Sequence, residues 1–356
     1  MTKAKATSFD IAHLAGVSQS TVSRALRNSP LVKSDTIARV HAIAQELNYK
    51  VDKNASALRL QRSDTLALLL FEDPTSDDSL INPFFHAMLS SITRACAREG
   101  YDLLVSFQQL SNDWTADFDD NHKADGLILL GYGDELDYRP KLQQLQQQGT
   151  HFVRWGPHSS VGLAISCDNH QGGFNATEHL LQLGHQRIAF IGDASEHSPE
   201  FLQRYQGYAK ALLHHNMVLD PTLQRTANST EEAGYRGIDQ LLAEQVRFDA
   251  VFAASDLIAI GVIKRIQEQG LRVPEEIAVV GFDDIQLAQL SSPPLTTVRQ
   301  DPQLAGQALV HSLLQQIQQQ PTADMTIPTE LVIRRSCGSH LQKPTNKLER
   351  LNTAAP

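Results

Sequence analysis

The sequence predicts a small all-α helix-turn-helix headpiece followed by a larger, two-lobed α/β domain with two parallel sheets and helices on both faces. Residues 1–62 contain ten Lys/Arg and four Asp/Glu, a net charge of +6, whereas the rest of the chain carries −15, giving −9 overall. Three short helical patterns lie in the basic part, and from residue 64 onward apolar runs alternate with helical stretches. At 356 residues the chain is also too long for one compact core.

The basic part has the signals of three short helices joined by tight connections. Thr7 is a candidate N-cap for the first helix, with Asp10 at the third helical position. Gly16 supplies the backbone freedom that a tight turn requires, and Ser18 is positioned to cap the next helix. A third helix begins near Ser34, which completes a helix-turn-helix plan. The apolar residues predicted to face the shared core are Ile11, Leu14, Val22, Leu26, Ile37, Val40, Ala44 and Leu47.

The second of these helices is predicted to lie in the major groove of double-stranded DNA. The side chains at its exposed N-terminal end are Ser18, Gln19, Ser20, Thr21 and Arg24. Glutamine can make a paired contact with adenine and arginine with guanine, while serine and threonine hydroxyls at a helix N-terminus suit phosphate oxygens. The alternative is that these residues are ordinary members of a solvent-exposed helix face.

The headpiece resembles that of the lactose-repressor/galactose-repressor family of bacterial transcription regulators. The resemblance is carried by residues 10–26, by Val32 and Thr36, and by the run 46–49. In that family the positions that match Gln19, Ser20 and Arg24 read bases, so the resemblance implies the same role here. One departure is Arg27, where members often carry asparagine.

Residues 51–63 resemble the hinge helix of that family, which folds when two copies meet in the DNA minor groove. The resemblance assigns the minor-groove contacts to Asn54, Ala55 and Leu58, with the leucine wedged between base pairs. The alternative is that Leu58 packs on the body of the protein. Members usually have Pro-Asn where this chain has Val51-Asp52, and an aspartate is unfavourable near phosphate. The predicted headpiece is therefore 1–50 and the hinge 51–63.

The rest of the chain alternates between strand-like and helical segments, which predicts parallel sheets with ligands at the carboxyl ends of their strands. Strand-like runs lie at 66–71, 103–106, 126–130, 152–154, 188–192, 250–254 and 277–282. Helical stretches between them include 85–100, 172–183, 201–215, 231–243 and 257–269.

The same family resemblance covers this region at 161–192, 261–298 and 331–336. It implies a periplasmic-binding-protein-like, effector-binding and dimerisation domain at 64–338. The predicted lobes are 64–165 with 296–325 and 166–295 with 326–338, and the tail 339–356 is predicted to be disordered. That tail lacks the leucine heptads of a tetramerising coiled coil, which favours a homodimer.

Position matches to the family predict an effector cleft between the lobes. Its expected residues are Phe84, Phe85, Trp155, Ser198, Glu200, Arg204, Ser255, Asp256 and Asp283. Aromatic rings can stack on a sugar, and arginine and aspartate can bond its hydroxyls. Two alternatives remain: one of the two phenylalanines points into the core, and Asp256 caps a helix.

Two departures from the family concern the ligand. Many members have an aromatic residue at the position of Ser229, so one stacking wall is missing. Arg154 stands where an acid is common, which suggests a phosphorylated or acidic sugar unless this arginine pairs with Asp168.

Other functional classes have little support. No phosphate-binding loop, nucleophile elbow or His-Glu-x-x-His motif is present, so we expect no catalysis, cofactor or metal site. The adjacent His214 and His215 are expected at a helix end on the surface. Three widely spaced cysteines, no apolar run of roughly 20 residues and no signal-peptide pattern predict a cytoplasmic protein without a membrane span.

The predicted function is a repressor of carbohydrate-utilisation genes that binds a near-palindromic DNA operator as a homodimer. Its effector is expected to be a sugar or sugar phosphate. One alternative is a regulator that depends on a co-repressor, as in the purine branch of the family. Another is a sugar-binding receptor without DNA function, although such a receptor would need a signal peptide and no basic headpiece.

Overall fold

The structure is a computed structural model that describes residues 6–49, 63–71, 81–108, 123–131, 134–158 and 161–341. The chain forms two compact units, 1–63 and 64–356. The predicted hinge residues Asn54, Ala55 and Leu58 lie outside the described residues.

The headpiece consists of three helices, as predicted: α1 (Ser8–Ala15), α2 (Gln19–Leu26) and α3 (Ser34–Glu46). Thr7 and Asp10 form a capping box, in which the Thr7 backbone N–H donates to the Asp10 carboxylate at 2.7 Å. Gly16 ends α1 with φ +64°, a conformation that favours glycine. Ser18 caps α2 by accepting a hydrogen bond from the Thr21 backbone N–H at 3.2 Å.

A small apolar core joins the three helices. Its fully buried members include Ile11, Val22 and Val40. The prediction that Leu14 faces this core is wrong, because its side chain is 58% exposed. The buried face of α1 instead follows the i, i+4 spacing of Ile11 and Ala15, and Leu14 lies about 100° around the helix from Ala15.

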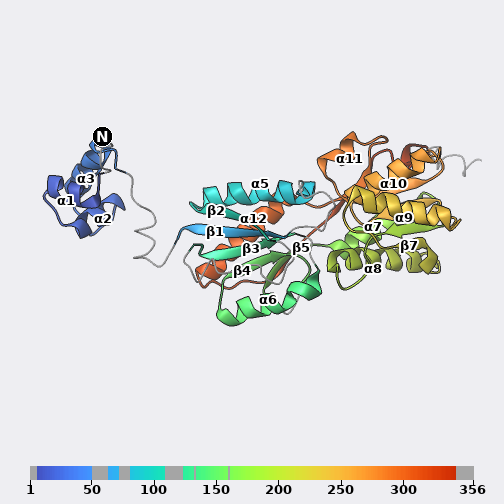
Figure 1. Cartoon of the computed structure of the whole chain (residues 1–356), viewed down its shortest axis with the longest axis horizontal. Coiled ribbons are helices and arrows are strands. Elements are labelled where there is room, and N and C mark those ends of the chain that lie inside the picture. Colours follow the sequence, from blue (N-terminus) through green and yellow to red (C-terminus); the bar gives the residue numbers. More distant parts are fainter. Residues whose placement is uncertain are drawn as a thin grey trace, which may run out of the picture. The chain divides into compact units, whose positions relative to one another are not determined.

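The first lobe is built on a six-stranded parallel sheet in the order β11-β5-β4-β3-β1-β2. Its strands are β1 (Thr65–Phe71), β2 (Asp102–Gln108), β3 (Gly126–Leu130), β4 (Phe152–Trp155), β5 (Leu163–Cys167) and β11 (Met325–Ile327). Helices α5 (Pro83–Arg98) and α12 (Pro302–Ile317) cover one face, and α6 (Glu135–Gln148) covers the other (Figure 1). The side chains of β1 alternate accordingly: Leu68 packs in the cluster with α5 and α12, whereas Leu69 packs with α6.

The second lobe repeats this plan in the order β12-β10-β9-β8-β6-β7, with only β12 antiparallel to its neighbour. The strands are β6 (Ile188–Ile191), β7 (Gln224–Arg225), β8 (Ala250–Ala253), β9 (Ala278–Asp283), β10 (Thr296–Arg299) and β12 (Glu330–Val332). The helices are α7 (Asn169–Gln182), α8 (Pro199–His214), α9 (Glu231–Ala243), α10 (Asp256–Glu268) and α11 (Gln286–Leu290), with short 3₁₀ turns at Pro221–Leu223 and Ser339–Leu341. Helix α7 packs on α8 and α9 on α10.

The lobe boundaries differ from the predicted ones. Strand β10 belongs to the second lobe, because Thr296 continues the parallel register beside Val280 of β9. Strand β11 belongs to the first lobe, where Met325 pairs with Ile165. The later crossings therefore follow β10 and β11, a few residues beyond the expected 295 and 325. The 3₁₀ turn at Ser339–Leu341 also lies within the tail predicted to be disordered.

Close contact between α7 and α8 depends on glycines at the helix crossing. A Cβ on Gly173 would lie 2.2 Å from the backbone oxygen of Arg204, and one on Gly207 would lie 2.1 Å from that of His170. These backbones can therefore touch only while both positions lack side chains.

Replacing Gly173 with alanine is expected to destabilise the protein by about 1–3 kcal/mol through overpacking, although alanine is the better helix former by about 1 kcal/mol. Gly237→Ala is a control, because its nearest neighbour is a side-chain atom of Ile191, at 2.9 Å, instead of backbone. Chemical denaturation measures the free energy of unfolding of both variants. A Gly173→Ala variant as stable as the parent would contradict the close helix contact.

Candidate functional site

The N-terminus of α2 presents a group of hydroxyls. Ser18 Oγ lies 2.8 Å from both Ser20 Oγ and Thr21 Oγ1. Ser18 and Ser20 are exposed and Thr21 is half-buried. These hydroxyls surround the N-terminus of α2, where the Thr21 N–H is bonded to Ser18 and the preceding N–H groups have no partner within the helix, an arrangement that suits a phosphate oxygen.

The two predicted base-reading side chains of α2 differ in how they are held. Gln19 is half-buried and donates from Nε2 to Ser8 Oγ at 2.9 Å, which leaves its second amide hydrogen and Oε1 available. Arg24 is exposed, and its guanidinium has no hydrogen bond or ion pair within the described parts of the chain. Arg27 is instead tied back to its own helix through Ser23, at 3.1 and 3.2 Å.

The predicted effector cleft corresponds to the place where strand order reverses in each sheet. Strand β1 is flanked by β2 and β3, and β6 is flanked by β7 and β8. Crevices outside the carboxyl ends of such strands are the usual ligand sites of doubly wound sheets. The predicted effector residues Trp155 and Asp283 are the last residues of β4 and β9, at these carboxyl ends.

Arg204 is a buried cation held by several segments of the second lobe. Its Nε donates to Asn169 Oδ1 at 2.8 Å, and its Nη1 donates to the Ala254 carbonyl at 2.5 Å. Nη1 also lies 3.5 Å from Asp283 Oδ1. The guanidinium carbon is 3.8 Å from the centroid of the Phe282 ring, within cation–π range.

Asp283, the carboxylate beside this arginine, interacts with a second buried carboxyl group, Asp256. Burial raises the pKa of Asp283 to about 6, against the opposing effects of Arg204 and a 2.5 Å hydrogen bond from Gln300 Nε2. Burial and the charge of Asp283 also raise the pKa of Asp256. The oxygens of Asp256 accept from Thr297 Oγ1 at 2.5 Å and from the Ile285 backbone N–H at 2.9 Å. The Asp256 carboxyl group therefore connects α10 to β10 and to the segment after β9.

Asp283 also has a strained backbone, with φ +118°. Such a conformation costs a non-glycine residue about 1–3 kcal/mol and is concentrated at functional sites.

A buried chain of polar side chains connects the two lobes. Asn82 Nδ2 donates to Ser229 Oγ at 3.2 Å, and Ser229 Oγ donates to Ser255 Oγ at 2.9 Å. Asn82 caps α5 by accepting from the Phe84 backbone N–H, and Ser255 caps α10. The small serine at 229, where an aromatic was expected from the family, thus takes part in a contact between the lobes.

The predicted aromatic residues form one buried cluster in the first lobe. The Phe84 ring lies 5.6 Å from that of Phe85 and 5.9 Å from that of Trp155, between centroids. All three side chains are at most 7% exposed and belong to the main core cluster. Burial in the core therefore applies to both phenylalanines, and not to only one of them.

Arg154 forms a second buried charged cluster. It donates to the Pro157 carbonyl and lies 3.5 Å from Glu135 Oε2, while its Nε is buried without a hydrogen-bond partner among the described residues. Burial raises the pKa of Glu200, against the charges of Arg204 and Arg154. The predicted alternative, an Arg154–Asp168 pair, is wrong, because Arg154 faces Glu135 and Asp168 caps α7.

The mouth of the cleft has further polar contacts between the lobes. His197 Nδ1 lies 2.5 Å from Asp134 Oδ2, and the Glu135 backbone N–H donates to the His197 carbonyl at 3.2 Å. The predicted Ser198 is half-exposed, and its hydroxyl donates to Asp193 at 2.9 Å.

Comparison with known proteins identifies the family. Residues 9–52 match the model for bacterial regulatory proteins of the lacI family, and 177–337 match a periplasmic binding protein-like domain. The Ribose operon repressor of Escherichia coli is 31% identical over 330 residues, which cover 90% of this chain and 97% of that repressor. The chain belongs to the lacI family. The resemblance seen in the sequence is thereby confirmed.

Solved structures of lacI-family regulators have the same architecture. A lac repressor dimer bound to operator and the anti-inducer ONPF has a TM-score of 0.78 at 27% identity, covering 94% of this chain and 99% of that one. A complex of the transcriptional regulator CelR with cellobiose has a TM-score of 0.69 at 30% identity, covering 93% and 99%. These relatives are transcription regulators. In the described part of this lacI-family chain, no helix has the length and apolar character to cross a bilayer.

Several cleft residues of this lacI-family chain were missed by sequence reasoning. They are Asn82, Glu135, Asn169, Ser229 as an inter-lobe contact, and Gln300. Only Asn82 has a local signal, since an asparagine before Pro83 is typical of a helix N-cap followed by proline at the first position. The others are brought to the cleft by long-range packing.

Arg204→Met is expected to lower the free energy of unfolding by about 3–5 kcal/mol near neutral pH, because it leaves the buried Asp283 carboxylate without its cation. Arg236→Met, which breaks an exposed pair with Glu232, should change it by less than about 0.5 kcal/mol. Urea denaturation measures both variants. A loss no larger than that of the control would contradict the role of Arg204.

The loss of unfolding free energy in Arg204→Met, called the deficit below, should also depend on pH. The pKa of Asp283 is raised from 3.8 to about 6, so the folded protein binds this proton when the unfolded chain has lost it. This group therefore contributes less stability as pH increases from about 4 to about 6. Loss of Arg204 raises the pKa further, so the deficit should be smaller at about pH 5 than at about pH 8. An equal deficit at both would contradict this assignment.

Proposed function

We propose that the chain is a cytoplasmic, non-enzymatic repressor of carbohydrate-utilisation genes that binds a near-palindromic operator as a homodimer and responds to a neutral sugar. The observation that carries the proposal is the exposed side of α2, where Arg24 has no ion pair among the described residues, in a headpiece that matches the lacI family model. Three free, buried cysteines are consistent with a reducing compartment.

The proposed DNA contacts divide into base reading and positioning. Gln19 in the first turn of α2 and Arg24 in its last turn read adenine and guanine edges, and Ser20 follows Gln19 in the first turn. Ser18 and Thr21 contact phosphates at the helix N-terminus. Ser8 orients the amide of Gln19, since its hydroxyl occupies one amide hydrogen and leaves the donor–acceptor pair that adenine needs.

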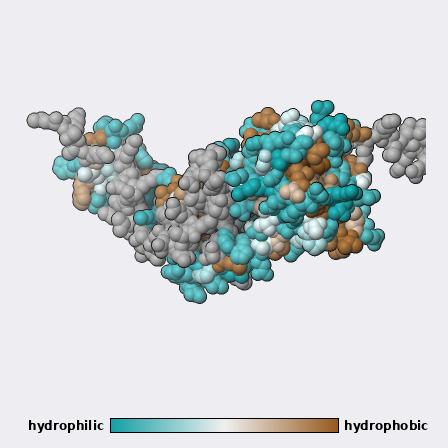
Figure 2. Space-filling model, turned by 45° about the vertical axis from the view of Figure 1, so that its right-hand side comes forward, coloured by the Kyte–Doolittle hydropathy of each residue, from teal (hydrophilic) through white to brown (hydrophobic). Residues whose placement is uncertain are grey.

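Exposed apolar surfaces support the proposed homodimer. On the face drawn in Figure 2, hydrophobic side chains form separate patches on a largely hydrophilic surface. In the first lobe, Leu104 and Phe107 of the edge strand β2 are 39% and 54% exposed to solvent. In the second, Leu287 and Leu290 of α11 are 46% and 74% exposed. A second copy of the chain would cover both surfaces.

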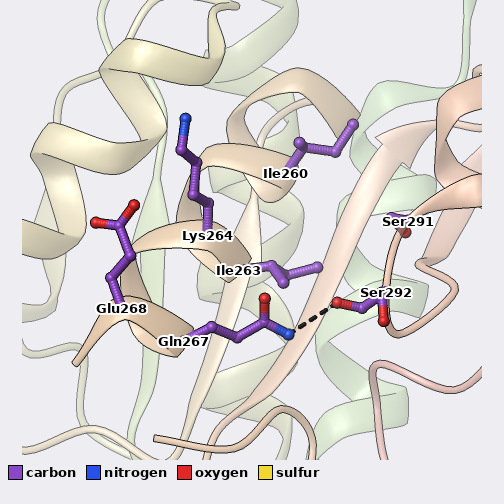
Figure 3. Close-up of a pocket in the computed structure, with 7 residues that line it drawn as sticks. All are labelled: Ile260, Ile263, Lys264, Gln267, Glu268, Ser291 and Ser292. Atoms are coloured by element: carbon purple, nitrogen blue, oxygen red, sulfur yellow. Dashed lines mark hydrogen bonds between the residues drawn. The ribbon is translucent and has the colours of Figure 1, made fainter. Parts of the chain in front are cut away.

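A pocket beside α11 fits the same role. It lies between α10 and the segment that follows α11, where Gln267 Nε2 donates to the Ser292 carbonyl at 2.8 Å (Figure 3). Its lining residues are Ile260, Ile263, Lys264, Gln267, Glu268, Ser291 and Ser292. Apolar walls with a charged rim are typical of a protein interface.

The charges of the cleft support a neutral sugar over a phosphorylated one. Arg154 is already matched by Glu135 and adjoins Glu200, so it has no excess positive charge for a phosphate. The buried Arg154 Nε and Gln300 Oε1 are a donor and an acceptor without partners among the described residues. A hydroxyl both donates and accepts, so a polyhydroxy ligand could satisfy both groups.

We propose that the ligand regulates DNA binding through the contacts between the lobes. A ligand that competes with the Asn82–Ser229 and Asp134–His197 contacts would change the angle between the lobes and thereby the spacing of the two headpieces in the dimer. It can shift this balance only through unequal affinity for the two arrangements. Release of DNA on sugar binding is the proposed direction, and co-repression would be the reverse.

Arg24→Ala is expected to remove about 1–3 kcal/mol of discrimination at one base pair, or about 5- to 150-fold in relative affinity. Arg39→Ala, which removes an exposed arginine from α3, is the charge-matched control. It should weaken binding to all sequences equally. Binding assays on operator and single-substitution duplexes measure both variants. If Arg24→Ala retains full discrimination, α2 does not read bases as proposed.

A thermal-shift screen tests the effector proposal. Neutral sugars are expected to include one that raises the melting temperature, because it binds the folded state, whereas sugar phosphates should have no effect. Arg154→Met should weaken the binding of that sugar about tenfold through loss of a charge-assisted hydrogen bond, and the exposed Arg187→Met should not. Selective stabilisation by sugar phosphates would contradict the proposal.

A further inference from the structure

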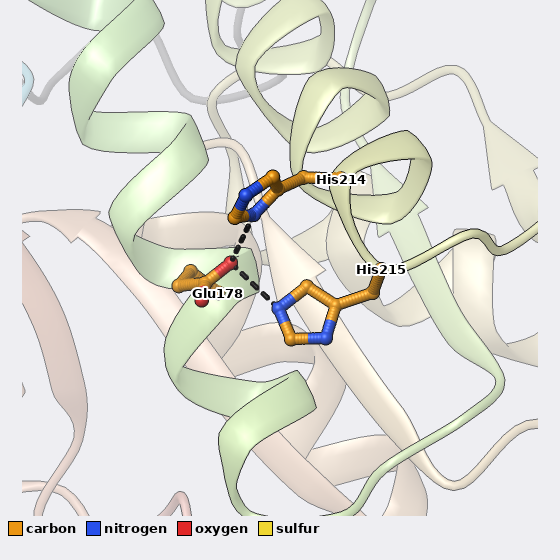
Figure 4. A group of neighbouring side chains, drawn as sticks. All are labelled: Glu178, His214 and His215. Carbon is orange, nitrogen blue, oxygen red and sulfur yellow. Dashed lines mark hydrogen bonds and ion pairs between the residues drawn. The ribbon is translucent and has the colours of Figure 1, made fainter.

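Three potential metal ligands meet on the outer surface of the second lobe. Glu178 projects from α7, and His214 and His215 lie at the C-terminal end of α8 (Figure 4). His215 Nε2 is 2.8 Å from Glu178 Oε2, and His214 Nδ1 is 3.7 Å from the same oxygen. The ligand atoms of all three residues lie within 4.8 Å of one another. Four-coordinate zinc with bonds of about 2.0–2.1 Å holds its ligand atoms about 3.3 Å apart, so only small side-chain movements are needed.

The two helices that supply these ligands are fixed against each other. Gly173 and Gly207 allow the backbones of α7 and α8 to touch, since a Cβ at either position would lie 2.2 Å or less from a backbone oxygen. A site built on two packed helices keeps its ligands in position without a bound ion.

Neighbouring side chains orient the ligands. Gln182 Nε2 donates to Glu178 Oε1 at 3.1 Å, which leaves Oε2 facing the two imidazoles. The centroid of the His214 ring lies 6.0 Å from that of the Phe174 ring. Phe174 is on α7, one helical turn before Glu178. Outer partners of this kind fix the orientation of metal-binding side chains.

The charge of Glu178 also favours a cation. Within the described parts of the chain its partners are His214, His215 and Gln182, with no lysine or arginine among them. A carboxylate oxygen between two imidazole rings is therefore available to a metal ion without a competing cationic side chain among these partners.

We propose that Glu178, His214 and His215 bind a divalent transition-metal ion, with Zn²⁺ as the representative. Imidazole nitrogen and carboxylate oxygen are donors that zinc accepts, and three protein ligands leave a fourth position for water. The ion would fasten the end of α8 to α7. It would lie at the far end of α8 from Arg204, about 15 Å along the helix for ten residues. The site is thus separate from the cleft and does not depend on DNA or sugar binding.

The test is titration of the full chain, first freed of metal with a chelator, with ZnCl₂ in competition with a chromophoric chelator. One tight zinc site per chain is expected. His215→Ala and Glu178→Gln should each weaken it at least about tenfold. His311→Ala, which removes an exposed histidine from α12 in the first lobe, is the matched control and should leave zinc affinity unchanged.

Zinc binding by a His214→Ala variant and Co²⁺ absorption spectra test the same site independently. His214 is 68% exposed, so His214→Ala should fold normally and still weaken zinc binding. Co²⁺ added to the wild-type chain should give the intense visible absorption of a four-coordinate site, and the His215→Ala variant should lose it. Absence of a tight zinc site, or equal zinc affinity in the wild type and the ligand variants, would overturn the proposal.

Discussion

The buried guanidinium of Arg204 is the interaction on which the second lobe and its cleft depend. It joins three segments by contacting Asn169 at the start of α7, Ala254 after β8 and Asp283 at the end of β9. An unpaired buried charge is costly, so these segments are held at fixed positions around the cation. Gly173 allows the backbone of α7 to reach that of Arg204 itself, so helix packing and charge pairing reinforce each other.

Contacts between the lobes include buried and exposed polar pairs, which suit a cleft that must open and close. The Asn82–Ser229 hydrogen bond and the His197–Asp134 pair each join one side chain from either lobe. Polar contacts of this kind exchange readily with water or with ligand hydroxyls. A sugar that bonded Arg154 Nε, which has no partner in the described part of the chain, would add to these contacts or replace them, and so bias the angle between the lobes.

Local signals predicted the headpiece closely, whereas long-range pairings were missed. The capping box of Thr7 and the cap at Ser18 depend only on neighbouring residues, and both helices begin where expected. Thr296–Arg299 was assigned to the wrong lobe, because its place depends on pairing with β9. Arg204 was predicted at the cleft through the family resemblance, yet its partners came from distant segments. The adjacent histidines gave no hint of Glu178, which lies 37 positions before His215.

Ligand binding in the proposed cleft and DNA binding at the headpiece are proposed to be thermodynamically coupled, and this coupling can be measured from both sides. Calorimetry would give the affinity of the identified sugar for the free protein and for the operator complex, and binding assays would give operator affinity with and without sugar. Linkage requires both ratios to equal the same factor. We expect equal ratios that differ clearly from one. A sugar affinity unaffected by operator would contradict it.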